Sequence, residues 1–444
     1  MKLSFHGAAG TVTGSCYLLT TDTSKIVIDC GLFQGSPELE QLNSEPFGFT
    51  PSEATGMLLT HAHLDHCGRI PKLVREGFNG PIYMNQATYD LLEIALNDAA
   101  KVMAEHKEKA AIYSEDDVIK TLQMAHIIEY NTPFQFGGFS ITYVNAGHIL
   151  GSASIILEGF GKRIAFSGDL GNSPQDLIEP TEYITNADIV VMESTYGDRN
   201  HPDEDPTTVL QEEINAVEKT GAALLIPAFS LERTQELLHK IDHLKKKGLV
   251  KEETVVYMDS PMAIRATDVF RAHPELYNEE LKNHLETDDP FSFTGLQVTQ
   301  RGKDSVRIKN QPGTKVIIAG SGMMTGGRIL NHAANYLPDS KTHLLIVGFQ
   351  AEHTIGRQIT EGATHVKVYG QDVAVNAVVR ESHAMSSHAD QTGLLTWIKH
   401  VANPQRLFLT HGEDGPREAL KLKITDIHQS VHIETPHLHD EVEL

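Results

Sequence analysis

The stretch His61-Ala62-His63-Leu64-Asp65-His66 places three imidazoles and one carboxylate directly after the apolar run Met57-Leu58-Leu59-Thr60. The apolar run predicts a short buried strand, so the polar residues that follow it should lie on a loop at the edge of a sheet. Histidine nitrogen and aspartate oxygen are the ligands that zinc uses in hydrolytic sites. The spacing can serve two ions, with His61 and His63 facing one and Asp65 and His66 facing the other. The stretch therefore predicts metal binding, and it leaves open whether Cys67 is a further ligand or a small buried residue.

Length and composition set the class of protein. The chain has 444 residues, 40% of them hydrophobic, which predicts two or three domains with sizeable cores. No apolar run approaches the roughly 20 residues needed to span a bilayer, and the first residues lack the apolar core of a signal peptide. Cys16, Cys30 and Cys67 offer no disulfide framework. We therefore expect a cytoplasmic protein with no membrane partner, and the sequence leaves a homodimer open.

The net charge of -22 argues against a nucleic-acid substrate, because phosphate binding usually leaves a basic footprint. The distribution of charge weakens this objection. Residues 206–378 carry 19 Lys/Arg and 21 Asp/Glu, while the remaining residues carry 18 and 38. Residues 301–315 include five basic residues and one acidic residue, Asp304. This run is either a solvated face or a contact for a polyanion.

Two kinds of pattern divide the chain. The first part predicts a helix over 86–111 and strands near 139–145, 153–157, 163–167 and 188–192. From about 206 the pattern alternates helices with buried apolar strands, which is typical of a parallel sheet covered on both faces. The predicted helices are 206–219, 232–247, 261–272 and 327–336, and the predicted strands are 222–227, 254–258, 315–319 and 343–347.

Three more metal-binding side chains recur at strand ends beside glycine. They are His148 after Ala146-Gly147, Asp169 after Ser167-Gly168, and His411 before Gly412. Glycine lets a backbone turn sharply and approach a site closely. With the residues of 61–66 they supply seven ligands, which is enough for two zinc ions if Asp169 bridges them.

The order of these motifs resembles that of the metallo-β-lactamase superfamily, and Asp29 matches its first motif. Val191–Gly197, which contains Glu193, resembles motif A of the β-CASP branch. Ser386–Asp390, which contains His388, resembles motif B, and Leu409–Glu413 resembles motif C. The resemblance implies an α/β fold in which a metallo-β-lactamase αββα sandwich carries an inserted α/β β-CASP domain. The implied domains are 1–205 and 378–444 for the sandwich and 206–377 for the insert.

The family's site roles carry over residue by residue. The resemblance implies one zinc held by His61, His63 and His148, a second held by Asp65, His66 and His411, and Asp169 as the bridge. His388 matches the general acid that protonates the leaving ribose oxygen, and Glu193 its orienting partner. Asp29 is expected to fix the site loop or a ligand histidine.

The insert offers candidate phosphate contacts. Gly320-Ser321-Gly322-Met323 follows a predicted strand and precedes a helix, where backbone N–H groups can bind an anion. Ser321, Gly322, Met323 and the nearby Arg328 are therefore candidates for RNA binding. Arg233 is a candidate for phosphate or for a salt bridge between domains, and the sequence does not choose between the two.

The resemblance implies a zinc-dependent ribonuclease, since β-CASP enzymes are phosphodiesterases acting on nucleic acids. Members directed at RNA resemble this chain in having histidine in motif C. We expect endonucleolytic cleavage of single-stranded RNA, with 5′-exonuclease activity as an option. The rival hypotheses are a small-molecule metallo-hydrolase of the thioesterase or lactamase type and a non-catalytic RNA-binding scaffold.

Overall fold

The computed structural model describes residues 1–105, 111–174 and 176–444, and it divides into two compact units. Unit 1 comprises Met1–Asn200 and His388–Leu444, and unit 2 comprises His201–Ser387. Both predicted boundaries, after residues 205 and 377, fall inside unit 2. At the second boundary the reason is strand β19 (Val378–Glu381), which pairs in parallel with β16 (His343–Ile346) of unit 2.

The first sheet of unit 1 contains both ends of the chain. Its strand order is β22-β1-β2-β3-β4-β5-β6, and the outer strand β22 pairs antiparallel with β1. The strands from β3 to β6 run parallel. The bounds are Lys2–Phe5 (β1), Tyr17–Thr20 (β2), Lys25–Ile28 (β3), Gly56–Leu58 (β4), Ile82–Met84 (β5), Ala125–Ile127 (β6) and Glu441–Glu443 (β22).

The second sheet of unit 1 has the order β21-β20-β11-β10-β9-β8-β7. Strands β7 to β10 form an antiparallel meander, and β10, β11, β20 and β21 run parallel. The bounds are Phe134–Phe136 (β7), Phe139–Asn145 (β8), Ala153–Gly159 (β9), Lys162–Phe166 (β10), Ile189–Met192 (β11), Arg406–Leu409 (β20) and His432–Glu434 (β21).

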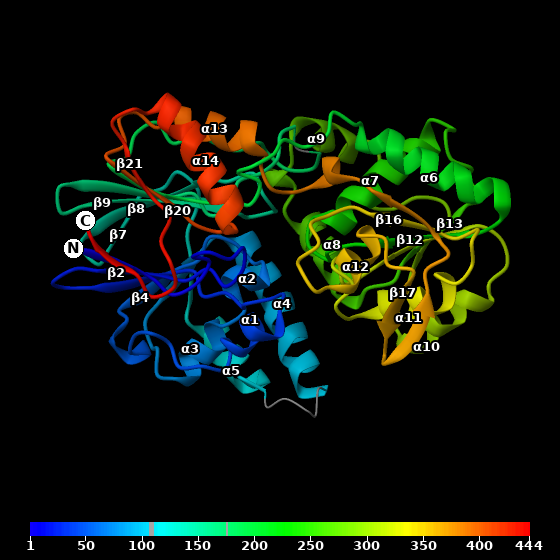
Figure 1. Cartoon of the computed structure of the whole chain (residues 1–444), viewed down its shortest axis with the longest axis horizontal. Helices are drawn as coiled ribbons and strands as arrows, with labels where there is room; N and C mark the ends of the chain where they lie inside the picture. The colour runs from blue at the N-terminus through cyan, green and yellow to red at the C-terminus, as the bar shows by residue number, and fades with distance from the viewer. Residues whose placement is uncertain (106–110, 175) are drawn as a thin grey trace. The chain divides into compact units, whose positions relative to one another are not determined.

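Helices cover the outer faces of both sheets, so unit 1 has four layers (Figure 1). The helices on the first sheet are α1 (Pro37–Gln41), α2 (Leu64–Cys67), α3 (Ile70–Arg75), α4 (Gln86–Glu105) and α5 (Glu115–Gln123). Those on the second sheet are α13 (Gln391–His400) and α14 (Asp414–Ile427), drawn in orange and red. The predicted αββα sandwich is confirmed. The predicted helix 86–111 is present as far as Glu105, and residues 106–110 lie outside the described residues.

Side chains that alternate along each strand build two cores, because successive residues of a strand point to opposite faces. In β11, Ile189 and Val191 join the core between the two sheets, which includes Phe5 and Phe166. The intervening Val190 and Met192 join a second core with residues of α13 and α14, including Trp397. This sandwich holds the loops at the strand ends in place.

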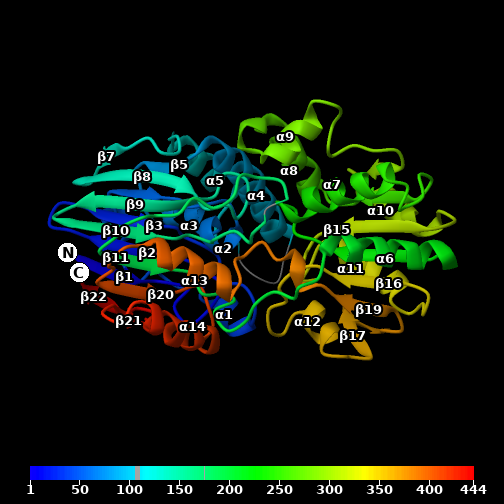
Figure 2. The ribbon, with the colours of Figure 1, turned by 90° about the horizontal axis from the view of Figure 1, so that it is seen from above.

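Unit 2 is built on a six-stranded parallel sheet of order β14-β13-β15-β12-β16-β19. Helices lie on both faces of this sheet, as predicted (Figure 2). The remaining strands are β12 (Ala223–Pro227), β13 (Val255–Met258), β14 (Leu296–Val298), β15 (Lys315–Ala319) and the separate hairpin β17 (His365–Val368) and β18 (Gln371–Ala374). The helices are α6 (Pro206–Thr220), α7 (Arg233–Lys246), α8 (Pro261–Ala272), α9 (Glu279–Leu285), α10 (Gly302–Arg307), α11 (Arg328–Tyr336) and α12 (Ile355–Thr360).

Candidate metal centre

The ends of four strands of unit 1 deliver the candidate ligands to one edge of the sandwich. The loop after β4 carries His61 and His63, and α2 follows it directly with Asp65 and His66. The loops after β8, β10 and β20 carry His148, Asp169 and His411. The turn that carries Asp169 requires glycine at position 168. The φ of Gly168 is +58°, and a Cβ there would lie 2.8 Å from the Ala153 carbonyl oxygen.

One group of nitrogens gathers around His63. His63 Nδ1 lies 3.2 Å from His61 Nε2 and 3.1 Å from His148 Nε2. Asp169 Oδ2 lies 3.5 Å from His61 Nε2 and 3.6 Å from His148 Nε2. His61 and His148 are fully buried, and burial lowers the pKa of His61 well below its usual range, which keeps the ring neutral. A neutral imidazole is the form that binds a metal ion.

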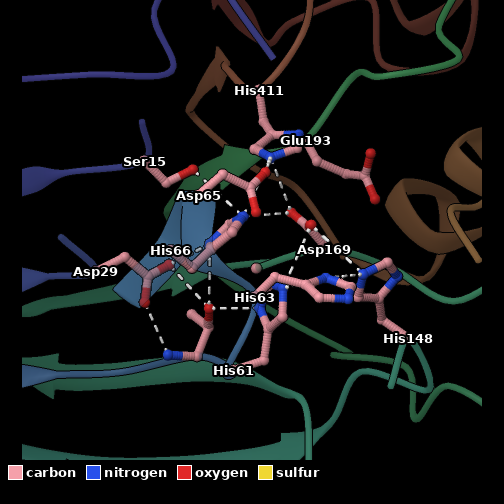
Figure 3. A network of polar contacts seen from close by, with 12 residues as sticks. Ser15, Asp29, His61, His63, Asp65, His66, His148, Asp169, Glu193 and His411 are labelled. Carbon is pink, nitrogen blue, oxygen red and sulfur yellow. Dashed lines mark hydrogen bonds and ion pairs between the residues drawn. The ribbon is translucent and has the colours of Figure 1, made fainter. Parts of the chain in front are cut away.

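A second group gathers around His66 and His411. Their Nε2 atoms are 3.1 Å apart, and His411 Nε2 lies 3.4 Å from Asp65 Oδ2. Asp169 Oδ1 lies 3.1 Å from His66 Nε2 and 3.5 Å from His411 Nε2. The two oxygens of Asp169 therefore face different groups, and Figure 3 shows this carboxylate between them.

The surroundings of Asp169 indicate whether the residues of the two groups fit metal ions. Its side chain is 1% exposed, and neither oxygen accepts a hydrogen bond from the residues that the structure describes. Burial alone would raise the pKa of Asp169, but His411, His66 and His388 lower it well below its usual range, so the carboxylate is ionised. A buried carboxylate without hydrogen-bond donors calls for a cation. The ring of imidazoles around it is a suitable donor set.

Hydroxyl and carboxylate groups behind the ligands orient the rings. Asp29 Oδ2 lies 2.8 Å from His66 Nδ1, and the same carboxylate accepts hydrogen bonds from the Thr60 amide and hydroxyl, both at 2.8 Å. Thr60 Oγ1 is also 3.0 Å from His61 Nδ1, and Thr195 Oγ1 is 3.0 Å from His411 Nδ1. These contacts leave the Nε2 atoms of the three rings facing Asp169.

Sequence reasoning placed Asp29 behind a ligand but missed Thr60 and Thr195. Thr60 directly precedes His61, and Thr195 lies in motif A, so their position beside a motif was the available signal.

Cys67 lies outside both ligand groups. Its thiol donates to the Ala62 carbonyl oxygen at 3.4 Å, and burial raises the pKa of the thiol.

His388 and Glu193 lie at the border of the first ligand group. His388 Nδ1 is 3.2 Å from Glu193 Oε1, and its Nε2 is 3.9 Å from Asp169 Oδ2. Glu193 is buried, and its Oε1 also accepts the Leu170 amide at 2.7 Å. Burial lowers the pKa of His388, but the carboxylates of Glu193 and Asp169 outweigh it and raise the pKa to about 9.

The candidate phosphate contacts belong to unit 2, and their side chains already have partners there. Arg328 donates to Asp259 Oδ1 at 2.7 Å and to the Thr299 and Gln300 carbonyl oxygens. Arg233 pairs with Glu236 and donates to Ser387 Oγ at 3.0 Å. Ser321 Oγ accepts the amides of Thr325 and Gly326, so part of the loop's N–H set is used within the loop.

The comparisons with known proteins agree with this geometry. Residues 9–228 match the metallo-beta-lactamase superfamily, residues 234–359 the Beta-Casp domain, and residues 372–436 the Zn-dependent metallo-hydrolase RNA specificity domain. Ribonuclease TTHA0252 of Thermus thermophilus is 38% identical over 424 residues, which cover 95% of each chain. The chain belongs to the β-CASP branch of the metallo-β-lactamase superfamily. Membership of this superfamily implies metal binding, and the two ligand groups are its structural counterpart.

Other β-CASP relatives extend the match. The transcription termination factor FttA of Methanosarcina mazei is 32% identical and covers 93% of this chain and 67% of its own. The RNase J-like protein of Methanocaldococcus jannaschii is 29% identical and covers 93% and 92%. A crystal structure of a protein of unknown function from Enterococcus faecalis V583 shares the fold, with a TM-score of 0.56 at 12% identity over 100% of this chain and 99% of that one.

In the described part of the chain, every helix is too short or too polar to cross a bilayer.

Proposed function

We propose that this β-CASP protein is a ribonuclease that hydrolyses RNA phosphodiester bonds with two bound Zn²⁺ ions. One observation carries the proposal: Asp169 turns one oxygen to each of two ligand groups, and His388 lies beside it with a carboxylate partner. Support comes from the relatives named as a ribonuclease and an RNase J-like protein. The match of residues 372–436 to an RNA specificity domain points the same way.

The donor set favours zinc. One ion would be held by His61, His63 and His148. The other would be held by Asp65, His66 and His411, and Asp169 would bind both ions. Mixed imidazole and carboxylate sites suit Zn²⁺, and the three imidazoles around Asp169 Oδ2 match a hydrolytic site. Bound zinc supplies an ionised water at neutral pH and neutralises charge on a phosphoryl oxygen.

His388 would act as the general acid. The Nδ1 atom of His388 contacts Glu193. The Nε2 atom therefore faces the centre and can give a proton to the leaving ribose oxygen. Cations at Asp65 and Asp169 would neutralise two of the carboxylates that raise the pKa of His388. The pKa would then fall from about 9 towards the ordinary value of 6.5, where the ring exchanges protons readily near neutral pH.

We place the RNA contacts of unit 2 on the loop Ser321-Gly322-Met323 rather than on free guanidinium groups. The ion pair of Arg328 with Asp259 fixes the start of α11 and so holds this loop. The ion pair of Arg233 with Glu236 likewise favours a structural role for that residue. We propose single-stranded RNA as the substrate and internal cleavage as the main reaction.

Labelled single-stranded RNA with defined ends tests this function. Zinc-loaded wild type should release internal fragments. His388→Ala should retain its zinc and cleave about 10²- to 10⁴-fold more slowly, because only proton transfer is lost. Asp169→Ala should lose both zinc and activity. His432→Ala replaces an exposed histidine of unit 1 and should behave as wild type.

The other outcomes are equally informative. If wild type leaves RNA intact while it opens a thioester, the protein is a small-molecule hydrolase and the ribonuclease proposal fails. If His388→Ala loses zinc in metal analysis, His388 is a ligand and its role as acid is wrong. Release of nucleotides only from the 5′ end would replace internal cleavage by exonuclease action.

A further inference from the structure

Three histidines of unit 2 converge outside the centre described above. His239 and His243 lie four positions apart on α7, and His284 lies on α9. His243 Nε2 is 3.2 Å from His284 Nδ1, and the His239 ring lies with its centroid 4.2 Å from that of His243 and 5.2 Å from that of His284. One nitrogen of each ring lies within 4.8 Å of the other two. Histidines at i and i+4 share one helix face, which is an arrangement that binds zinc.

Two carboxylates lie behind the third ring, on its Nε2 side. Asp242 Oδ2 lies 3.2 Å from His284 Nε2, and Asp288 Oδ1 lies 2.8 Å from the same nitrogen. Lys246 Nζ lies 2.8 Å from the same nitrogen. In the tautomer with hydrogen on Nε2, the two carboxylates accept this hydrogen, and the lone pair of Nδ1 points towards His243. Metal-binding histidines usually donate their other ring N–H to a carboxylate in this way.

Burial and charge also suit a cation. The His239 and Asp242 side chains are almost fully buried, and that of His284 is 7% exposed. Lys246 lies on the Nε2 side of His284, where its ammonium pairs with Asp242 and Asp288 at 2.9 and 2.8 Å. Two carboxylates and one ammonium leave a net negative charge beside the three imidazoles. The nitrogens of the three rings face one another with no ammonium between His243 Nε2 and His284 Nδ1.

We propose that His239, His243 and His284 form a further metal site in unit 2, which takes Zn²⁺ or a similar divalent transition-metal ion. Three imidazoles supply three of the four positions of a tetrahedral zinc and leave one for water. The ion would join α7 to α9 and so fix the segment between α8 and β14. No residue of this site belongs to the ligand groups of unit 1.

Metal analysis of the full chain tests the site without any RNA assay, so its result is independent of the proposed ribonuclease activity. Zinc per chain is measured after removal of loosely held metal. His243→Gln and His284→Gln should each bind one equivalent less than wild type. His365→Gln, at an exposed histidine of β17, should bind as much as wild type. In a His61→Ala/His63→Ala background, adding His243→Gln should again remove one equivalent.

Equal zinc content in wild type and the two cluster variants would overturn the proposal. If a cluster variant fails to fold, the His61→Ala/His63→Ala protein with its intact cluster is modified with diethyl pyrocarbonate instead. Zinc should then protect His243 from modification, as read by peptide mass spectrometry. Modification of His243 that is unchanged by zinc would leave the three rings as an ordinary stack with an ion-pair network.

Discussion

Asp29 influences the metal centre through two other residues. It is 1% exposed, adopts a positive φ of 56°, and binds Thr60 and His66 with both carboxylate oxygens. The contact with His66 Nδ1 fixes both the tautomer and the orientation of that ring. An amide in place of the carboxylate would keep the size of the side chain but remove its charge.

Asp29→Asn should therefore weaken zinc binding about 10- to 100-fold, because the ligand histidine loses its charged partner. Competition with a chromophoric chelator measures this affinity. Asp22→Asn, at an exposed position of the turn before β3, is the matched control and should leave the affinity unchanged. An unaltered affinity in Asp29→Asn would show that Thr60 and the protein backbone suffice to hold His66.

At this scale the sequence allowed much of the centre to be predicted. All seven predicted ligands converge, because each follows a strand end at one edge of the sandwich. The hydroxyls of Thr60 and Thr195 could not be predicted, since serine and threonine are common and their partners depend on tertiary packing. The pairing of Arg328 with Asp259 also depends on tertiary packing and could not be predicted, because 69 positions separate the two residues.

At the scale of elements, Asp259 links three segments of unit 2. It follows β13 directly and is fully buried. Its carboxylate accepts from Ser305 of α10 and from Arg328 and His332 of α11. Burial raises the pKa of Asp259, but His332, Ser305 and Arg328 outweigh it and lower the pKa below its usual range.

Asp259→Ala should destabilise unit 2 by about 3–5 kcal/mol, because it leaves Arg328 without its buried partner. Urea unfolding at neutral pH measures the change. Asp268→Ala, at a carboxylate whose side chain is 68% exposed, is the control and should stay within about 0.5 kcal/mol of wild type. A loss below 1 kcal/mol in Asp259→Ala would mean that water replaces the carboxylate.

Most elements of the insert could be predicted because their apolar periodicity is strong. The predicted strand 315–319 and the observed β15 coincide, and the helices 206–219 and 261–272 agree with α6 and α8 within one residue. The boundary at 377 was harder to place. The short strand β19 is half exposed, so only its pairing with β16 assigns it to unit 2.

On the scale of the whole chain, the two ends meet in unit 1 around His6. This residue follows β1 and is 7% exposed. Its Nε2 lies 2.9 Å from Ser4 Oγ, and its ring contacts Phe49 and, near the end of the chain, His439. Burial, followed by the charges of His439 and Arg69, lowers the pKa of His6 from 6.5 to about 4.

His6 should therefore make unit 1 sensitive to acid. Between pH 6.5 and 4 the unfolded chain binds a proton at this position and the folded chain does not, so stability falls as the pH falls. The shift corresponds to at most about 3 kcal/mol. Unfolding free energies measured across this range should depend less on pH in His6→Gln than in wild type. Parallel curves for the two proteins would show that His6 is protonated while folded.

The order of the residues along the chain also governs when the centre can exist. His66 and His411 are 345 positions apart, and all of unit 2 is encoded between Glu193 and His388. A chain still being translated carries the first ligands but has neither His388 nor His411. During that time it remains attached to a ribosome, beside its own messenger RNA. The sequence order thus withholds the cutting chemistry from a nascent chain until the codons of His388 and His411 have been read.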